Sequence, residues 1–214
     1  MRQLNRHLFA PAFRGGSTLK QSLRGIRGSR CRIGWYVLSV CPRDGAEPSA
    51  YPGRVRGDGD GWVVSESGSR HWGRHGAAGL LLRAPGPDGR AAVLLQHRAP
   101  WSHQGGTWGL PGGALDSHET PEQAAVREAN EEAGLSAEAL RVRVTLVTAQ
   151  VAAIGGGSWS YTTVIADADG LLDTIANRES DELRWVAVDD ITDLPLHPGF
   201  AASWPQLRAV IAEL

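Results

Sequence analysis

The chain has 214 residues, 42% of them hydrophobic and 21% charged, a balance typical of one globular domain with an appendage and not of a disordered chain. No apolar run approaches the roughly 18 residues that a membrane-spanning helix needs, so we expect no membrane partner. The formal net charge of -1 combines a basic segment, residues 1–45, with a remainder that has 13 basic and 22 acidic side chains. Because this remainder is acidic, it disfavours nucleic acid as a stable partner.

Residues 1–55 form a basic extension in which Arg, Gly and Ser recur and acids are almost absent. We predict that this extension is disordered. Its composition also fits a loosely packed segment, a targeting segment, a nucleic-acid contact or sequence ahead of the true start site, and these alternatives stay open. Both cysteines, Cys31 and Cys41, lie within it. Residues 56–214, predicted to be a single domain, therefore have no disulfide framework or thiolate metal site, which fits a cytoplasmic protein.

Folded sequence is predicted to begin near residue 57. Two apolar runs, residues 75–82 and 91–98, are separated by the turn sequence Pro-Gly-Pro-Asp-Gly at residues 85–89, which predicts a pair of strands. Residues 101–113 are rich in Gly and Trp and are predicted to be a loop.

A helix is predicted to follow this loop. Thr120 supplies an N-cap oxygen, Pro121 takes the first helical position, and Gln123 completes a capping box. Gly134 is a natural C-terminal stop. Further strands are predicted at residues 140–148, 159–166 and 182–188, with a closing helix at 201–214. This order of elements predicts an α+β or mixed α/β fold with a mixed sheet, not a doubly wound one.

Three carboxylates share one face of the predicted central helix. Glu128, Glu131 and Glu132 stand at i, i+3 and i+4, which brings like charges close together. They fit a solvated helix face, the usual meaning of a charge run. They fit equally a site for a hard cation such as Mg²⁺ or Mn²⁺, which would supply the missing positive charge.

The residues around this helix match a known motif in identity and spacing: Gly113, Glu119, Arg127, Glu128, Glu131, Glu132, Gly134 and Leu135. This pattern resembles the Nudix box, the loop-helix-loop signature of the Nudix hydrolases. One position departs from the pattern, because Ala129 stands where a bulky aliphatic residue is expected. The resemblance extends over residues 72–214 and implies an α/β/α sandwich with nucleotide pyrophosphohydrolase activity.

The resemblance also implies roles for individual residues. Mg²⁺, with Mn²⁺ as a substitute, would be bound by the carbonyl of Gly112 and by glutamates: Glu128, Glu131, Glu132 and Glu179. Glu179 is the expected downstream ligand because it stands six residues before Trp185, and Glu182 is the alternative. Glu119 and Arg127 would hold the helix and aim the ligands. One or more of Glu128, Glu132 and Glu179 would act as the general base.

The chain most resembles the MutT-type branch of the family, which implies hydrolysis of 8-oxo-dGTP to 8-oxo-dGMP and pyrophosphate. Four residues are expected to contact the substrate: Trp108, Arg98, His197 and Phe200. The loop after the last strand lacks the base-reading Asn of that branch, which leaves His197, Asn177 or backbone groups to read the base. Two alternatives remain: a pyrophosphatase for ADP-ribose or other nucleotides, and a weakly active nucleotide-sensing module. The oligomeric state is left open.

Overall fold

The computed structural model describes residues 57–214, so the basic extension predicted for residues 1–55 lies outside the described residues. The helices are α1 (Pro121–Ala133) and α2 (Pro198–Ala212), with the short 3-10 helices η1 (Ala137–Ala139) and η2 (Val188–Asp193). The strands are β1 (Trp62–Val64), β2 (Arg70–Trp72), β3 (Ala77–Pro85), β4 (Ala91–Arg98), β5 (Trp108–Gly109), β6 (Gly112–Ala114), β7 (Arg141–Ala152), β8 (Ser158–Asp167) and β9 (Ser180–Ala187). Within residues 57–214, no helix is long and apolar enough to cross a bilayer.

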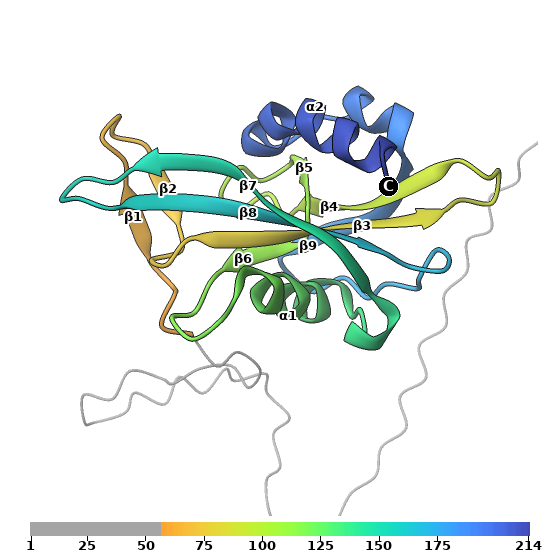
Figure 1. Ribbon diagram of the computed structural model, residues 1–214, viewed down its shortest axis with the longest axis horizontal. Coiled ribbons are helices and arrows are strands. Elements are labelled where there is room, and N and C mark those ends of the chain that lie inside the picture. Colours follow the sequence, from red (N-terminus) through yellow and green to blue (C-terminus); the bar gives the residue numbers. More distant parts are fainter. Residues whose placement is uncertain (1–56) are drawn as a thin grey trace, which may run out of the picture. The chain divides into compact units, whose positions relative to one another are not determined.

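A mixed sheet forms the middle layer of the domain. Its strands follow the order β5-β4-β3-β8-β7, with β6 paired to β3 and β9 paired to β4. The central pair, β3 and β8, is parallel, whereas β3 with β4, β4 with β9 and β7 with β8 are antiparallel. Figure 1 shows α1 on one face of this sheet and α2 on the other. The expected α/β/α sandwich is confirmed.

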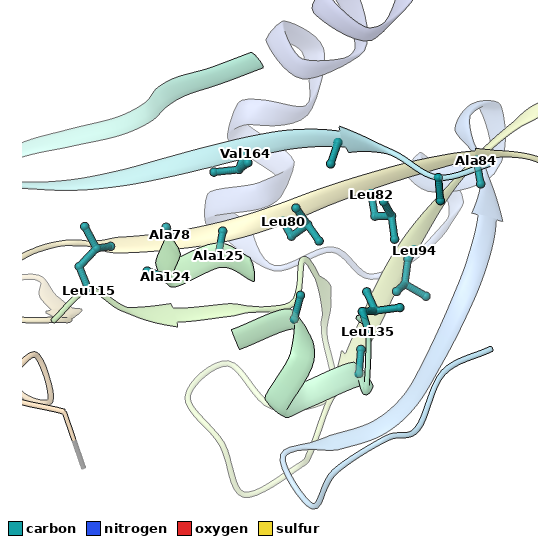
Figure 2. Close-up of a cluster of buried hydrophobic side chains, with 14 residues drawn as sticks. Ala78, Leu80, Leu82, Ala84, Leu94, Leu115, Ala124, Ala125, Leu135 and Val164 are labelled. Carbon is teal, nitrogen blue, oxygen red and sulfur yellow. The ribbon is translucent and has the colours of Figure 1, made fainter. Parts of the chain in front are cut away.

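Alternate residues of the central strands divide the core into two halves, because successive side chains of a strand point to opposite faces. Leu80 and Leu82 pack on the α1 side, whereas Leu81 packs on the α2 side. The α1 side is lined by small residues of the helix, including Ala124 and Ala125 (Figure 2). These small side chains let the helix backbone lie close to the sheet, which places the face of α1 that carries the glutamates beside the ends of the strands.

The ends of α1 match the sequence prediction. The hydroxyl of Thr120 accepts the Gln123 N–H, and the Gln123 side chain accepts the Thr120 N–H, which completes the capping box. Gly134 ends the helix in the left-handed region, at φ 68°, which glycine adopts without a steric penalty. The sequence therefore fixes both ends of the helix that carries the box.

Three segments differ from the prediction. Residues 101–113 are not loop throughout, since they contain β5 and β6, two strands too short to show a periodic pattern. The last helix begins at Pro198 and not at residue 201, because the His197 side chain caps it and Pro198 suits its first turn. The hairpin of β1 and β2 was not expected as an element.

Candidate functional site

The glutamates of α1 lie in two different environments. Glu128 and Glu132 are buried, with only 3% and 5% of their surface exposed, whereas Glu131 is exposed. A solvated helix face would leave all three carboxylates in water. The structure therefore excludes that interpretation for Glu128 and Glu132, and these two residues need a partner of opposite charge.

Arg127 is a charged partner of Glu128. Its guanidinium donates two hydrogen bonds to Glu119, of 2.6 and 2.8 Å, and a third to the Glu128 carboxylate at 2.8 Å. A fourth bond, of 3.0 Å, reaches the carbonyl of Ala114. Hydrogen bonds from Arg127 lower the pKa of Glu119, and both carboxylates in turn raise the pKa of Arg127. Arg127 thus ties α1 to the preceding loop and holds one oxygen of Glu128.

Among residues 57–214, Glu132 has no such ion pair. Its carboxylate accepts a 2.8 Å hydrogen bond from the backbone N–H of Gly112. Burial, together with the nearby charge of Glu128, raises the pKa of Glu132 to about 8, although Gly112 and the Gln96 side chain act in the opposite direction. A carboxyl group whose charge is so poorly compensated is a natural ligand for a cation.

Two glycines let the loop before α1 approach these carboxylates. A Cβ atom on Gly113 would lie 2.3 Å from a Glu128 oxygen, and one on Gly112 would lie 2.4 Å from the carbonyl oxygen of Ala78. Both distances are too short for any side chain. The paired glycines of the motif are therefore required by contact with the helix on one side and with β3 on the other.

The structure separates the two candidates for the downstream glutamate. The charge of Glu179 contributes to the raised pKa of Glu132, so Glu179 lies near the buried pair. Asn177 holds its loop to α1 by donating to the Glu131 carbonyl, at 3.3 Å, and by accepting the Glu179 N–H, at 2.8 Å. Glu182 instead forms two 2.8 Å bonds with Arg184. Glu179, not Glu182, is brought to the site, and Asn177 acts in holding this loop.

Gln96 and Tyr161 also lie at this site, and the sequence analysis assigned neither a role there. Gln96 is buried at the end of the apolar run of β4 and donates to the Ser180 hydroxyl at 2.8 Å, while its Oε1 has no hydrogen-bond partner among residues 57–214. Burial and the charge of Glu132 raise the pKa of Tyr161. The sequence feature that could have identified Gln96 is its position as a polar residue directly after the apolar run of β4.

Trp108 and Phe200 do not offer the open rings that the sequence suggested. They are only 5% and 6% exposed and belong to the core under α2. The Trp108 ring is stacked on His97, with centroids 4.8 Å apart, and the Arg184 guanidinium lies 4.7 Å from its centroid. Burial in the core is at odds with base stacking on either ring, and neither is retained as a substrate contact.

Arg98 and His197 lie together near the ends of β4 and β5. The Nε–H of Arg98 donates to the carbonyl of His103 at 3.0 Å, and the His103 and His197 rings are 6.4 Å apart. Burial and the charge of Arg98 lower the pKa of His197 to about 4. Its Nδ1 accepts the Gly199 N–H at 3.1 Å, so the ring is neutral and also caps α2.

A second acidic group lies outside the glutamates of α1. Asp58, Asp116 and His118 place candidate ligand atoms within 4.8 Å of one another, and among residues 57–214 they are the one set of three that does so. The Asp58 carboxylate accepts the Ser117 N–H at 2.8 Å, and Asp116 accepts the Gly59 N–H at 2.9 Å. The Asp58 and Asp116 carboxylates are thus each held by a backbone N–H.

Comparison with known proteins identifies the family. The model of the NUDIX domain matches residues 73–208. A Mycobacterium tuberculosis protein provisionally named 8-oxo-dGTP diphosphatase 3 is 72% identical over 165 residues, which cover 77% of this chain and 76% of that protein. A Bifidobacterium longum nucleoside triphosphate pyrophosphatase/Nudix hydrolase fusion protein is 40% identical over 170 residues, 75% of this chain but 33% of the fusion protein.

Solved structures agree with this assignment. The Nudix hydrolase RenU from M. smegmatis superposes with a TM-score of 0.71 and 74% sequence identity over 73% of this chain and 97% of its own. An Ap4A hydrolase from C. elegans, at 24% identity and a TM-score of 0.51 over 64% of this chain and 98% of its own, shares the fold. The chain belongs to the Nudix family and is a Nudix pyrophosphohydrolase.

Proposed function

We propose that this enzyme hydrolyses 8-oxo-dGTP to 8-oxo-dGMP and pyrophosphate with Mg²⁺ as cofactor, and so removes an oxidised nucleotide from the cytoplasmic pool. The observation that carries the proposal is the buried pair Glu128 and Glu132 inside the Nudix box, where Arg127 pairs with Glu128. The name of the M. tuberculosis relative supports the choice of substrate.

The residues present fit a divalent cation. Nudix hydrolases generally use divalent metals, and carboxylate and carbonyl oxygens are the ligands that Mg²⁺ and Mn²⁺ prefer. The raised pKa of Glu132 reflects a site that lacks positive charge. The residues that would hold the metal are Gly112, Glu128, Glu131, Glu132 and Glu179. When bound, the metal would neutralise phosphate charge and make a water molecule more acidic.

The protein's own groups would supply position and proton transfer. Arg127, fixed by Glu119, holds Glu128 in place, and the Gly112 N–H does the same for Glu132. A carboxylate of Glu128, Glu132 or Glu179 would take the proton of the attacking water. The water oxygen would bond to the β-phosphorus while the bond from that phosphorus to the α–β bridging oxygen breaks. Pyrophosphate keeps the water oxygen, and the monophosphate leaves with the bridging oxygen.

Arg98 would be a cation that binds the substrate. It is half-buried at the end of β4, two residues beyond Gln96, and its charge acts on Tyr161, which also experiences the charge of Glu132. A guanidinium in that position suits a phosphate oxygen or a base carbonyl. His197, neutral and close to Arg98, is the side chain that would exchange hydrogen bonds with the base.

A panel of nucleotides tests the proposal. Wild-type protein with Mg²⁺ is given 8-oxo-dGTP, dGTP and ADP-ribose, and pyrophosphate and phosphate release are measured separately. We expect pyrophosphate to be the product released from 8-oxo-dGTP, and kcat/KM to be highest for that nucleotide. Equal kcat/KM for dGTP would remove the sanitising role, and faster cleavage of ADP-ribose would point to another branch of the family. Tight nucleotide binding without turnover would support a sensing module instead.

A further inference from the structure

Burial of Trp108 and Phe200 raises the question of which aromatic surface meets the base. The exposed tryptophans of residues 57–214 are Trp62, Trp72 and Trp101. Trp62 and Trp72 belong to the β1–β2 hairpin, which precedes the residues matched by the NUDIX domain model. The family pattern therefore assigns no role to this hairpin.

The β1–β2 hairpin is fixed against the turn between β7 and β8. The Glu66 N–H donates to the Ala152 carbonyl at 3.0 Å, and the Ile154 N–H donates to the Val64 carbonyl at 2.9 Å. The indole N–H of Trp159 donates to the carbonyl of Trp72 at 3.0 Å. Figure 1 shows β1 and β2 at the end of the sheet where β7 and β8 turn. Both strands of the hairpin are therefore held in place.

Three neighbours orient the Trp62 ring. The Trp72 ring meets it edge-on with centroids 5.1 Å apart, and the His103 ring does so at 5.4 Å. The Arg70 guanidinium lies 5.0 Å from its centroid. Trp62 nevertheless keeps 40% of its surface exposed. A large aromatic surface is thus held in a fixed orientation toward solvent, a state that costs little further entropy when a ligand binds.

A series of contacts connects this ring to the buried glutamates. His103 lies between β4 and β5, and its carbonyl accepts the Nε–H of Arg98 at 3.0 Å. The indole of Trp159, which donates to the Trp72 carbonyl, lies 6.4 Å from the Tyr161 ring. The Tyr161 hydroxyl in turn lies against Gly79, the strand partner of Gly112. Because the Gly112 N–H donates to Glu132, these contacts lead from the exposed hairpin to the acidic centre. A nucleotide has the same order, with a flat base at one end and phosphates at the other.

We infer that the Trp62 ring, held edge-on by His103, is the surface on which the purine base of the substrate stacks. The inference rests on the proposed function and names the aromatic contact of the same site. Stacking on a ring hardly distinguishes one purine from another. Trp62 therefore sets affinity for the nucleotide, while hydrogen bonds near Arg98 and His197 set the preference for the oxidised base.

Equilibrium binding to the full chain tests this directly. Calorimetry in Mg²⁺ compares 8-oxo-dGMP with inorganic pyrophosphate, which has no base, on wild type and on Trp62→Leu, Trp62→Phe and Trp101→Leu. Trp101 is the matched control because it is 68% exposed and makes no ring contact within residues 57–214. Trp62→Leu should weaken 8-oxo-dGMP binding about tenfold or more, as expected for loss of a base–aromatic stack. Trp62→Phe and Trp101→Leu should bind nearly as wild type does.

Pyrophosphate affinity should be unchanged in every variant. Unchanged 8-oxo-dGMP binding by Trp62→Leu, an equal loss of pyrophosphate binding, or an equal loss in Trp101→Leu would overturn the inference. If Trp62→Leu does not fold, tryptophan fluorescence provides the test. Binding of 8-oxo-dGMP should quench the fluorescence of wild type more than that of Trp62→Phe. Equal quenching in the two proteins would overturn the inference. Binding is read without turnover, so failure to hydrolyse 8-oxo-dGTP would count against the proposed function alone.

Discussion

The glutamate-bearing face of α1 and the surface expected to meet the base are built in opposite ways. The first is local and charged: Glu119, Arg127, Glu128 and Glu132 come from one short stretch, and the carboxylates of Glu128 and Glu132 are buried. The second is assembled from the β1–β2 hairpin, the loop after β4 and the start of α2, and it is aromatic and half-exposed. Fixed spacing along the chain thus brings the charged residues together, whereas the aromatic surface depends on contacts between residues distant in sequence.

The largest effect is expected from Glu132, on the charged side of this comparison. Glu132→Gln keeps the shape of the side chain but removes its charge, so kcat should fall about 10²-fold or more, as for loss of a ligand or base. Steady-state pyrophosphate release measures this. A variant within twofold of wild type would show that the buried carboxylate takes no part in the reaction.

A smaller loss is expected from Arg127, because it acts by positioning Glu119 and Glu128. Arg127→Ala should lower kcat about 10- to 100-fold, as for removal of a group that orients a ligand, and should also reduce the melting temperature by leaving buried Glu128 without its ion pair. Arg208→Ala is the matched control, since Arg208 pairs with Asp189 at the surface. Equal losses in both variants would deny Arg127 a special role.

The charge on Glu132 should also appear in the stability of the metal-free protein. Burial raises the pKa of this carboxyl to about 8, so the folded state holds a proton that the unfolded chain gives up at lower pH. Its contribution to stability is complete below the ordinary carboxyl pKa and is lost as pH rises through about 8. In chelator, Glu132→Gln should therefore melt increasingly above wild type from pH 5 to pH 8. A constant difference between the two melting temperatures would contradict this.

The smallest effect is expected from removing residues 1–50. Because this segment lacks periodicity and acidic residues, its deletion should leave kcat/KM and the melting temperature of the remaining domain unchanged. Circular-dichroism melts and pyrophosphate release measure both. A melting temperature lower by several degrees would show that the extension contributes to the stability of the folded domain.

Sequence predicts these two regions to different extents. The cap at Thr120, the stop at Gly134 and the face shared by Glu128 and Glu132 follow from local rules, and the structure confirms the cap and the stop. Trp108 shows where local rules end. Its neighbour across the strands is His97, and this pairing places its ring on the α2 side of the sheet, within the core. The register of β5 against β4, and not the residue type, therefore determines that the Trp108 ring lies in the core.

Trp62 illustrates the converse case. Its role depends on edge-on contacts with Trp72 and His103, 10 and 41 positions further along the chain. A strand of three residues gives no periodic signal, so the hairpin could not be recognised in advance. Gln96 and Tyr161 became candidates only when the sheet brought their strands beside α1.

Manganese binding tests the central claim most directly, namely that the buried glutamates of α1 are the cation site. Calorimetric titration with Mn²⁺ compares wild type, Glu132→Gln and Asp58→Asn, the last taken from the other acidic group, Asp58, Asp116 and His118. Glu132→Gln should lose about tenfold or more in Mn²⁺ affinity, and Asp58→Asn should bind Mn²⁺ as wild type does. Wild-type affinity in Glu132→Gln together with a loss in Asp58→Asn would contradict the account.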